Sequence, residues 1–460
     1  MDIALEDIVY ATNGRFTGDF KILSEVNSIC IDSRKISNGD LFIPIKGENF
    51  DGHDFINEAF ENGAIAALIQ REHEGKIEKK NKHRTLIFVE DTKKALQDIA
   101  AFYKKKFDVK VIGITGSVGK STVKEMAASV FGTEFNVLKT QGNLNGQIGL
   151  PLVVLKLKKE TQVLVAEMGI SQIGEMENLS RIAEPDFAII TNIGISHLEY
   201  FKTTEITCRE KLKIAKNPNC RLYLNGDSPE LSRISCGLPN EIVYFGLNGD
   251  FSYKSEKICA SGESTDFVLI FDNFKENIKI PCLGIHNVYN ALAVISLALD
   301  VGIYLDDIKN GLENFSPLPQ RGQIIHINDI ILLNDSYNSS PDSVKASVSL
   351  LQFVRSEGKT IAIMADMLEL GVRSKEIHFE IGKYLALSGI DIVITIGNTA
   401  EFISKGAKAA KSNTITFECD SNAQAAEILL KNISKGDKVL VKGSRGMKTE
   451  EVIDLFLLGL

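Results

Sequence analysis

The 460-residue sequence lacks the marks of several large classes of protein. No uncharged apolar stretch approaches the roughly 18 residues that a membrane-spanning helix needs, so we expect no membrane span. The first residues, Met1–Asp7, have neither the basic nor the apolar region of a signal peptide, which favours a cytoplasmic protein. The seven cysteines are scattered and none forms a C-x-x-C pair, which argues against a disulfide framework and against a zinc site.

The charge and the motif content exclude further functions. The net charge is −8 and both signs are spread along the chain, which argues against general nucleic-acid binding and against a basic membrane anchor. The G-x-G-x-x-G fingerprint of dinucleotide-binding proteins is absent, as are internal repeats and low-complexity tracts. The chain is too long for one hydrophobic core, so we expect two to four domains.

The strongest positive signal is a glycine turn between a strand and a helix. The apolar run Val109–Ile114 predicts a buried strand, and Ser121–Phe131 predicts a helix. The turn is shorter than G-x-x-x-x-G-K-[ST], because Ile114 stands where that pattern has its first glycine. Backbone N–H groups at the start of a helix bind anions, a lysine supplies a point charge for phosphates, and a hydroxyl can bind Mg²⁺. The predicted phosphate loop comprises Gly116, Ser117, Val118, Gly119, Lys120, Ser121 and Thr122.

Two later strands end in side chains that are suited to binding a metal ion. The predicted strand Val163–Ala166 leads into Glu167, and Phe187–Thr191 leads into a segment that contains His197. The carboxyl ends of parallel strands meet at one edge of a sheet, where ligands and metals bind. Together with Ser121, these residues form a plausible oxygen and nitrogen shell for Mg²⁺.

Polar loops interrupt the first 90 residues, which contain predicted strands and one helix. Asp32-Ser33-Arg34 and the stretch from Gly47 through Asp51 to His53 lie on loops. Taken alone, Arg34 and His53 are better explained as surface charge than as ligand contacts, although loops often carry function. We expect a solvated, charged connection over Glu74–Lys82. The predicted strands are Val26–Ile31, Leu41–Ile45, Ala66–Ile69 and Thr85–Val89, and the predicted helix is Phe55–Asn62.

Two amide-rich stretches in the middle of the chain could contact a polar ligand. Thr140–Pro151 contains Asn143 and Asn145 and offers hydrogen bonds without charge. Asn287 and Asn290 lie one turn apart near the start of an apolar helix, where amides cap the helix or contact a base edge. A helix over Glu205–Lys216 carries Lys211, which on its own pattern is a solvated lysine. Several short strands are expected between residues 240 and 282.

The last part of the chain, from about residue 317, alternates strands with helices. This pattern predicts a mostly parallel sheet with ligand groups at the strand ends. The predicted strands are Ile330–Asn334, Thr360–Ala365, Ile392–Ile396, Thr414–Phe417 and Val439–Val441. Three of them lead into Asp335-Ser-Tyr-Asn338, Asp366-Met-Leu-Glu-Leu-Gly371 and Lys442-Gly-Ser-Arg445.

Taken together, these motifs resemble the Mur ligases, the ATP-dependent amide-forming enzymes of peptidoglycan precursor synthesis, over essentially the whole chain. The short phosphate loop is typical of that family and of its folylpolyglutamate-synthetase relatives. The resemblance is carried by Asp32-Ser-Arg34, Gly39-Asp-Leu-Phe42, Gly47 through His53, Thr115 through Thr122, Gly142-Asn-Leu-Asn145, Ala166-Glu-Met-Gly169, Asn192-Ile-Gly194, His197-Leu-Glu199, His286-Asn287, Asp335 through Asn338 with Pro341, Asp366 through Gly371 and Lys442 through Arg445.

The resemblance implies an α/β protein of three domains. They are a UDP-sugar-binding domain over residues 1–90, a central P-loop ATPase-type domain over 91–316 and a C-terminal Rossmann-like ligase domain over 317–460. It also implies ATP and Mg²⁺ as cofactors, with Gly116 to Thr122 on the ATP phosphates. Carried over residue by residue, the resemblance assigns magnesium binding to Ser121, Glu167, His197 and Lys211, and contacts with ATP to Asn287, Arg321, Asp335 and Asn338. It assigns catalysis to Lys120, Lys211 and His197. It assigns substrate binding to Asp32, Ser33, Arg34, Gly47, Asp51, His53, Asn143 and Asn145.

One family feature falls on a position that the residues alone do not single out. The family uses a lysine carbamylated by CO₂ as a magnesium ligand, and counting on from His197 places it at Lys211. The surroundings depart from the family pattern, because Glu210 precedes the lysine where alanine is usual, and Leu212-Lys213 follows where Gly-Glu is usual.

Within the family, the last-domain motifs favour the members that add D-alanyl-D-alanine to UDP-N-acetylmuramoyl-tripeptide, and we expect such a protein to be a monomer. The first alternative is a sibling that adds a single amino acid, diaminopimelate or lysine, to the dipeptide precursor, but its Asp-Asn-Pro-Arg motif is absent. A folylpolyglutamate-type ligase would have no use for the first domain. A GTPase-like switch would need an N-K-x-D motif, whereas Asn81-Lys82 is followed by His83-Arg84.

Overall fold

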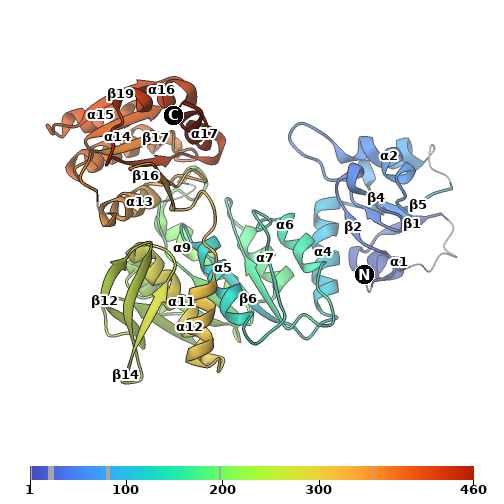
Figure 1. Ribbon diagram of the computed structural model, residues 1–460. Coiled ribbons are helices and arrows are strands. Elements are labelled where there is room, and N and C mark those ends of the chain that lie inside the picture. Colours follow the sequence, from blue (N-terminus) through green and yellow to red (C-terminus); the bar gives the residue numbers. More distant parts are fainter. Residues whose placement is uncertain (2, 19–24, 79–82, 196–197, 355, 460) are drawn as a thin grey trace. The chain divides into compact units, whose positions relative to one another are not determined.

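The computed structural model describes residues 1, 3–18, 25–78, 83–195, 198–354 and 356–459 (Figure 1). The chain forms two compact units. The first comprises Met1–Gly113, Asn136–Gly169 and Glu175–Asp186, and the second Ile114–Phe135, Ile170–Gly174 and Phe187–Leu460. No helix within the described ranges is both long enough and apolar enough to cross a membrane.

The N-terminal part is built on a five-stranded sheet in the order β1-β5-β4-β3-β2. Strands β2 to β5 are parallel, and β1 pairs with β5 in the antiparallel direction. Phe42, Phe60 and Phe88 belong to the core beneath the sheet. The elements are α1 (Leu5–Thr12), β1 (Arg15–Thr17), β2 (Ile29–Cys30), η1 (Ser33–Lys35), β3 (Leu41–Phe42), η2 (Gly52–Phe55), α2 (Ile56–Glu61), β4 (Ala66–Gln70), η3 (Arg71–His73), α3 (Glu74–Glu78) and β5 (Thr85–Val89).

The expectation of a solvated connection over Glu74–Lys82 is wrong for its first half. The chain forms helix α3 there, and Ile77 is buried against the N-terminal core. A single apolar residue within the charged run therefore fixes the segment to the protein. The predicted strands over Val26–Ile31 and Leu41–Ile45 are present only as the two-residue strands β2 and β3.

The central part contains a nine-stranded sheet in the order β14-β13-β12-β11-β10-β9-β6-β8-β7. Strands β9 to β12 are parallel, and β12, β13 and β14 form antiparallel hairpins against which α11 and α12 pack (Figure 1). The strands are β6 (Lys110–Thr115), β7 (Val137–Lys139), β8 (Val163–Glu167), β9 (Phe187–Ile190), β10 (Arg221–Asn225), β11 (Ile242–Gly246), β12 (Tyr253–Ser261), β13 (Ser264–Phe271) and β14 (Phe274–Ile280). The helices are α4 (Thr92–Lys104), α5 (Lys120–Phe131), α6 (Gly149–Val154), α7 (Glu175–Ala183), α8 (Leu198–Phe201), α9 (Thr204–Leu212), η4 (Lys213–Ala215), α10 (Pro229–Ser235), α11 (Ile285–Asp300) and α12 (Leu305–Asn314).

The C-terminal part is a doubly wound sheet in the order β15-β16-β20-β17-β18-β19. Only β15 is antiparallel to its neighbour, which confirms the predicted parallel sheet. Successive strand residues enter opposite cores, as Ile361 and Ala362 do, so helices cover both faces. The elements are β15 (Gln323–Ile327), β16 (Ile330–Asn334), α13 (Pro341–Phe353), β17 (Thr360–Ala365), η5 (Gly371–Arg373), α14 (Ser374–Leu387), β18 (Ile392–Ile396), α15 (Glu401–Ala409), β19 (Ile415–Cys419), α16 (Asn422–Asn432), β20 (Lys438–Lys442), η6 (Arg445–Met447) and α17 (Glu450–Gly459).

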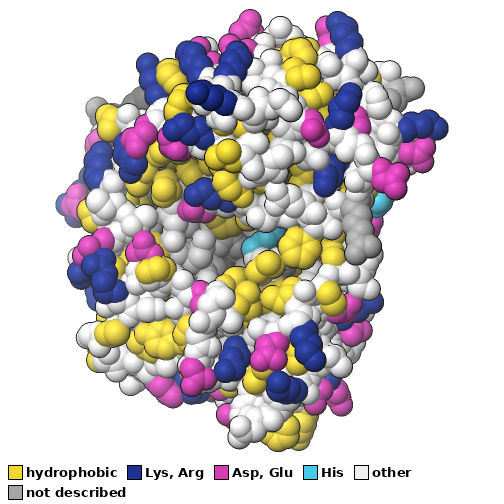
Figure 2. Space-filling view, turned by 90° about the vertical axis from the view of Figure 1, so that its left-hand side faces the viewer, with side chains coloured by type: hydrophobic (Ala, Val, Ile, Leu, Met, Phe, Trp, Pro, Cys, Tyr) yellow, Lys and Arg dark blue, Asp and Glu magenta, His cyan; other side chains and the backbone are white. Residues whose placement is uncertain are grey.

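Charged side chains of both signs are interspersed on the displayed face of the molecule (Figure 2). Basic residues form no continuous patch on this face. This distribution agrees with the spread of charge along the sequence.

Candidate active site

The predicted phosphate loop is present between the end of β6 and the start of α5. Its two glycines have positive φ, +152° at Gly116 and +89° at Gly119. A Cβ atom at Gly119 would lie 2.6 Å from Asn290 Oδ1, so this glycine also permits a close approach of α11. The first N–H groups of a helix have no acceptor within it and, with the helix dipole, are suited to bind an anion, so the start of α5 remains the predicted phosphate site.

The loop is held in place by the residues that follow β9. Ser117 N donates to Asn192 O over 3.0 Å, and Val118 N donates to Asn192 Oδ1 over 2.8 Å. The Thr191 hydroxyl donates to the carbonyl of Val118. Ser117 Oγ accepts from Gly194 N over 2.9 Å. Hydrogen bonds within the protein therefore stabilise the loop conformation. Asn192 makes two of them, and the sequence pattern assigned it no function.

Two lysines donate to a single backbone carbonyl in this loop. Lys120 Nζ lies 2.8 Å from Gly116 O, and Lys211 Nζ lies 3.0 Å from the same oxygen. Lys211 is 1 % exposed, so the interpretation as a solvated lysine is wrong. Burial lowers the pKa of Lys211 well below its usual value, and the nearby positive charge of Lys120 lowers it further.

Glu167 ends β8 and is buried within the first compact unit. Its N–H donates to Thr140 Oγ1 over 3.0 Å, and its Oε1 accepts from Asn145 Nδ2 over 2.7 Å. The amide-rich segment therefore orients this carboxylate. Asn143 is exposed on the same segment. His197, the other predicted metal ligand at a strand end, lies outside the described residues.

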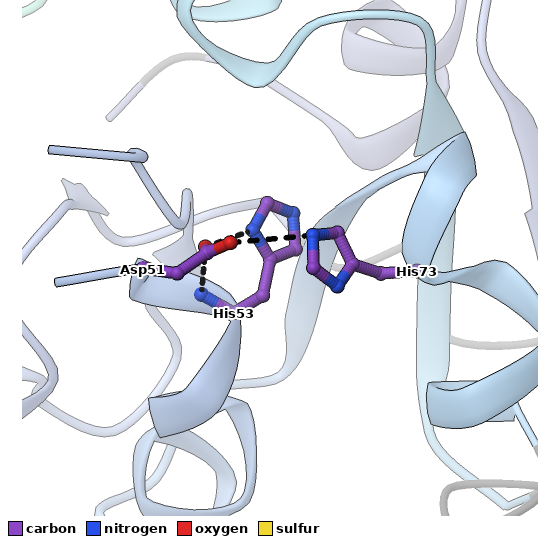
Figure 3. A group of neighbouring side chains, drawn as sticks. All are labelled: Asp51, His53 and His73. Atoms are coloured by element: carbon purple, nitrogen blue, oxygen red, sulfur yellow. Dashed lines mark hydrogen bonds and ion pairs between the residues drawn. The ribbon is translucent and has the colours of Figure 1, made fainter.

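Asp51 lies beside two histidines in the N-terminal part (Figure 3). Its Oδ1 lies 2.6 Å from His53 Nδ1, and its Oδ2 lies 3.3 Å from His73 Nε2. The two imidazole rings are stacked with centroids 4.1 Å apart. Gln70 N donates to His53 Nε2 over 3.0 Å, which places the proton of a neutral His53 on Nδ1, facing Asp51.

This arrangement corrects one prediction and limits what the group can bind. The side chain of His53 is only 1 % exposed, so it is not a surface charge, and burial lowers its pKa. Both ring nitrogens of His53 are engaged, one by Asp51 and one by the Gln70 N–H. His53 consequently has no lone pair directed at a metal ion, and its hydrogen bonds instead fix the loop that starts at Gly47.

The Asp32-Ser33-Arg34 motif forms the start of η1. Asp32 accepts from Arg34 Nε over 2.8 Å and from Arg34 Nη2 over 2.9 Å, and these bonds lower the pKa of Asp32 to about 2. The Arg34 side chain remains 78 % exposed, as expected of a surface charge. Ser33 is buried and donates to Glu58 Oε2. Gly47 donates to Phe50 O in the turn before Asp51.

In the C-terminal part, the loop after β16 brings three predicted nucleotide contacts into one neighbourhood. Asp335 Oδ2 accepts from Lys442 Nζ over 2.5 Å, and the carbonyl of Asn338 accepts from the same ammonium over 3.0 Å. The guanidinium of Arg321 lies over the ring of Tyr337, 3.8 Å from its centroid. Lys442 and Tyr337 lie within two of the family motifs, but the sequence pattern assigned no function to either residue.

Asn287 lies near the start of α11 and is buried. Its Nδ2 donates to Leu283 O over 2.8 Å, and its Oδ1 accepts from Asn290 Nδ2 over 3.0 Å. Asn290 in turn lies against Gly119. The two amides therefore link α11 to the phosphate loop.

Comparisons with known proteins agree with this architecture. Residues 25–104 match the description "Mur ligase family, catalytic domain", residues 114–298 match "Mur ligase middle domain", and residues 320–445 match "Mur ligase, glutamate ligase domain". The fold defines a three-domain α/β protein. The chain belongs to the Mur ligase family.

The similar proteins within that family carry a more specific name. UDP-N-acetylmuramoyl-tripeptide--D-alanyl-D-alanine ligase of Bacillus subtilis is 37 % identical over 433 residues, which cover 93 % of this chain and 92 % of that protein. A crystal structure of MurF from Acinetobacter baumannii superposes with a TM-score of 0.90 at 29 % identity and covers 98 % of both chains. MurF ligase of Thermotoga maritima in complex with ADP superposes with a TM-score of 0.83 at 30 % identity, covering 93 % of this chain and 96 % of that chain.

Proposed function

We propose that this chain joins D-alanyl-D-alanine to the free carboxylate of UDP-N-acetylmuramoyl-tripeptide, with conversion of ATP to ADP and phosphate. The relative from Bacillus subtilis is named for this reaction, and it matches the chain over nearly its full length. The observation that carries the proposal is the phosphate loop, in which Gly116 O accepts from both Lys120 and Lys211.

The reaction comprises a phosphoryl transfer followed by an acyl transfer. An oxygen of the peptide carboxylate attacks the γ-phosphorus of ATP, the bond to the β-phosphate oxygen breaks, and an acyl phosphate and ADP result. The amine of D-alanyl-D-alanine then attacks the acyl carbon, the tetrahedral intermediate expels phosphate, and the nitrogen loses a proton to give the amide. Lys120 offsets negative charge on the transferring phosphoryl group, and the N–H groups at the start of α5 hold the phosphates.

The residues that would hold magnesium are Ser121, Glu167, His197 and Lys211. The buried Ser121 hydroxyl lies in the first turn of α5, and the buried Glu167 carboxylate is oriented by Asn145. Oxygen ligands of this kind suit Mg²⁺, which when bound neutralises charge on the phosphate oxygens. Burial favours the neutral amine of Lys211, and a neutral amine can add to CO₂ with loss of a proton to give an anionic carbamate. That carbamate would supply one of the oxygen ligands.

The remaining assignments follow the three parts of the chain. Residues 1–90 would bind the UDP-sugar, 91–316 would bind ATP, and 317–460 would close over the nucleotide through Arg321, Asp335 and Asn338, with Asn287 at the adenine. The structure gives Asp335 and Asn338 a common partner in Lys442, which supports a joint contribution. The residues proposed to contact the UDP-peptide are Asp32, Ser33, Arg34, Gly47, Asp51, His53, Asn143 and Asn145.

One assay separates this function from that of a single-amino-acid ligase. The purified chain is mixed with ATP, Mg²⁺ and UDP-N-acetylmuramoyl-tripeptide, and D-alanyl-D-alanine, diaminopimelate or lysine is added in turn. The same amines are then offered with the dipeptide precursor. We expect phosphate release and a product of pentapeptide mass only in the mixture that contains both D-alanyl-D-alanine and the tripeptide. Amide formation only with a single amino acid would overturn the proposal.

A further inference from the structure

Lys442 is a buried cation to which neither the motifs nor the proposed reaction assigns a function. It is the last residue of β20, and its side chain is 1 % exposed. Its ammonium donates to Asp335 Oδ2 and to the carbonyl of Asn338, so one group binds both ends of a four-residue loop. Ser347 Oγ, from α13, donates to the same Asp335 oxygen.

These contacts decide which part of the Asp335 carboxylate remains available. Oδ2 is taken by Lys442 and Ser347, whereas Oδ1 has no hydrogen bond from any residue that the structure describes. The carboxylate is 19 % exposed, so Oδ1 can accept from a ligand. A nucleotide offers such donors in its ribose hydroxyls and its base amino group.

The same loop supports a cation that faces the nucleotide in our proposal. Tyr337 lies between Asp335 and Asn338, and its ring lies 3.8 Å from the guanidinium of Arg321. Tyr337 N donates to Gln320 O, so the backbone beside Arg321 is tied to this loop as well. A shift of the loop would therefore move the acceptor and the cation together.

We propose that Lys442 is a positioning residue for nucleotide binding. Its ammonium fixes the loop from Asp335 to Asn338 so that Asp335 Oδ1 and Arg321 face the nucleotide. A flexible loop would have to be ordered during binding, and the loss of ordering entropy would weaken the affinity. This inference rests on the proposed ligase function, because it assumes that ATP binds against this loop.

The test is Lys442→Met, which keeps an unbranched side chain one atom shorter and removes the charge. Lys438→Met is a matched control, because Lys438 lies on the same strand and donates to Leu351 O and Val354 O, away from the loop. We expect Lys442→Met to raise KM for ATP and Kd for ADP at least tenfold, with kcat at saturating ATP and KM for the UDP-peptide each within threefold of the unchanged protein. We expect all four values to stay within threefold in Lys438→Met.

The outcomes distinguish this inference from the function on which it rests. If the unchanged protein forms no amide with ATP, the proposed function fails. If the unchanged protein is active and folded Lys442→Met keeps its KM for ATP, the positioning function is refuted. A merely structural lysine would lower kcat or stability without a selective change in KM for ATP, and that result also refutes it. Should Lys442→Met not fold, Ser347→Ala removes the second donor to Asp335 Oδ2. We expect a two- to fivefold higher KM for ATP in this variant, and an unchanged value would overturn the proposal.

Discussion

Replacement of Gly116 by alanine tests whether the conformation of the phosphate loop is essential for ligase activity. Gly116 has φ of +152°, which residues with a Cβ atom rarely adopt. A Cβ atom built there would lie 1.9 Å from Thr191 Oγ1 and 3.1 Å from Thr191 Cβ. The new methyl group and the Thr191 hydroxyl cannot occupy these positions together, so either the loop or Thr191 must move.

The structure gives the size of the effect. An ordinary carbon–oxygen contact is about 3.2 Å or longer, so the loop or the side chain must shift by about 1 Å. Such a shift breaks the hydrogen bond from Thr191 to Val118 O and displaces the carbonyl that holds Lys120 and Lys211. A displacement of about 1 Å in a catalytic group lowers the rate roughly 100-fold, equivalent to about 2.7 kcal/mol. The positive φ adds about 1–3 kcal/mol of backbone strain.

The assay is kcat/KM for ATP in the ligase reaction, with circular dichroism and thermal melting to monitor the fold. Gly116→Ala should lower kcat/KM about 100-fold. The double variant Gly116→Ala with Thr191→Ala should recover part of this loss, because it removes the hydroxyl but leaves the strain. Gly237→Ala is the control, since a Cβ atom there meets nothing within 4 Å. A Gly116→Ala protein with kcat/KM within threefold of the original would refute the reasoning.

Three further predictions concern the two lysines and a histidine. Lys120→Ala should lose nearly all ligase activity while it melts at the normal temperature, and full turnover would disprove the assignment of the loop. Lys211→Ala should lose most of the activity and the carbamate signal in ¹³C NMR with labelled bicarbonate. A wild-type rate would refute the carbamate proposal but not the proposed ligase function. Burial lowers the pKa of His53 in the folded protein, so its neutral form and its bond from the Gln70 N–H are fully present above the ordinary pKa of about 6.5 and are lost as the pH falls through the lower folded value. Hydrogen-exchange protection of the Gln70 amide should therefore fall on acidification while that of Leu68 on the same strand does not, and equal pH dependence of the two would contradict the predicted titration.

Most of the buried strands could be predicted from the sequence because they are short apolar runs bounded by turn residues. Expected and observed bounds coincide for β16, β17 and β18, and they differ by one residue for β6 and β8. Short or amphipathic elements were missed, among them α1, β1, β7 and β15, because a three-residue edge strand or an eight-residue helix carries too few apolar positions to form a pattern. Strand β15 lies at a sheet edge and is only partly buried, and the polar Gln323 and His326 interrupt its apolar residues.

The candidate site was predictable where the function lies in a contiguous motif. The phosphate loop has its signal within a few residues of the sequence, and the backbone there follows from its two glycines. The side chains that position the site lie far from it in the sequence. Asn192 binds Val118, and Lys442 binds Asp335, across 74 and 107 residues respectively. No local pattern reports such contacts, because they depend on which strand ends become neighbours in the folded sheet.

The pair of lysines on Gly116 O explains why a carbamate suits this position. Two positive charges at one acceptor repel each other, and the buried member of the pair gives up its proton more readily. Lys211 is that member, and its lowered pKa has burial as the first cause and the charge of Lys120 as a further one. Addition of CO₂ to the neutral amine would place an anion beside Lys120, so the two side chains would attract each other. The departures from the family pattern at Glu210 and Leu212 leave this logic intact, because Glu210 Oε1 accepts from Gly174 N and Leu212 is a buried apolar residue.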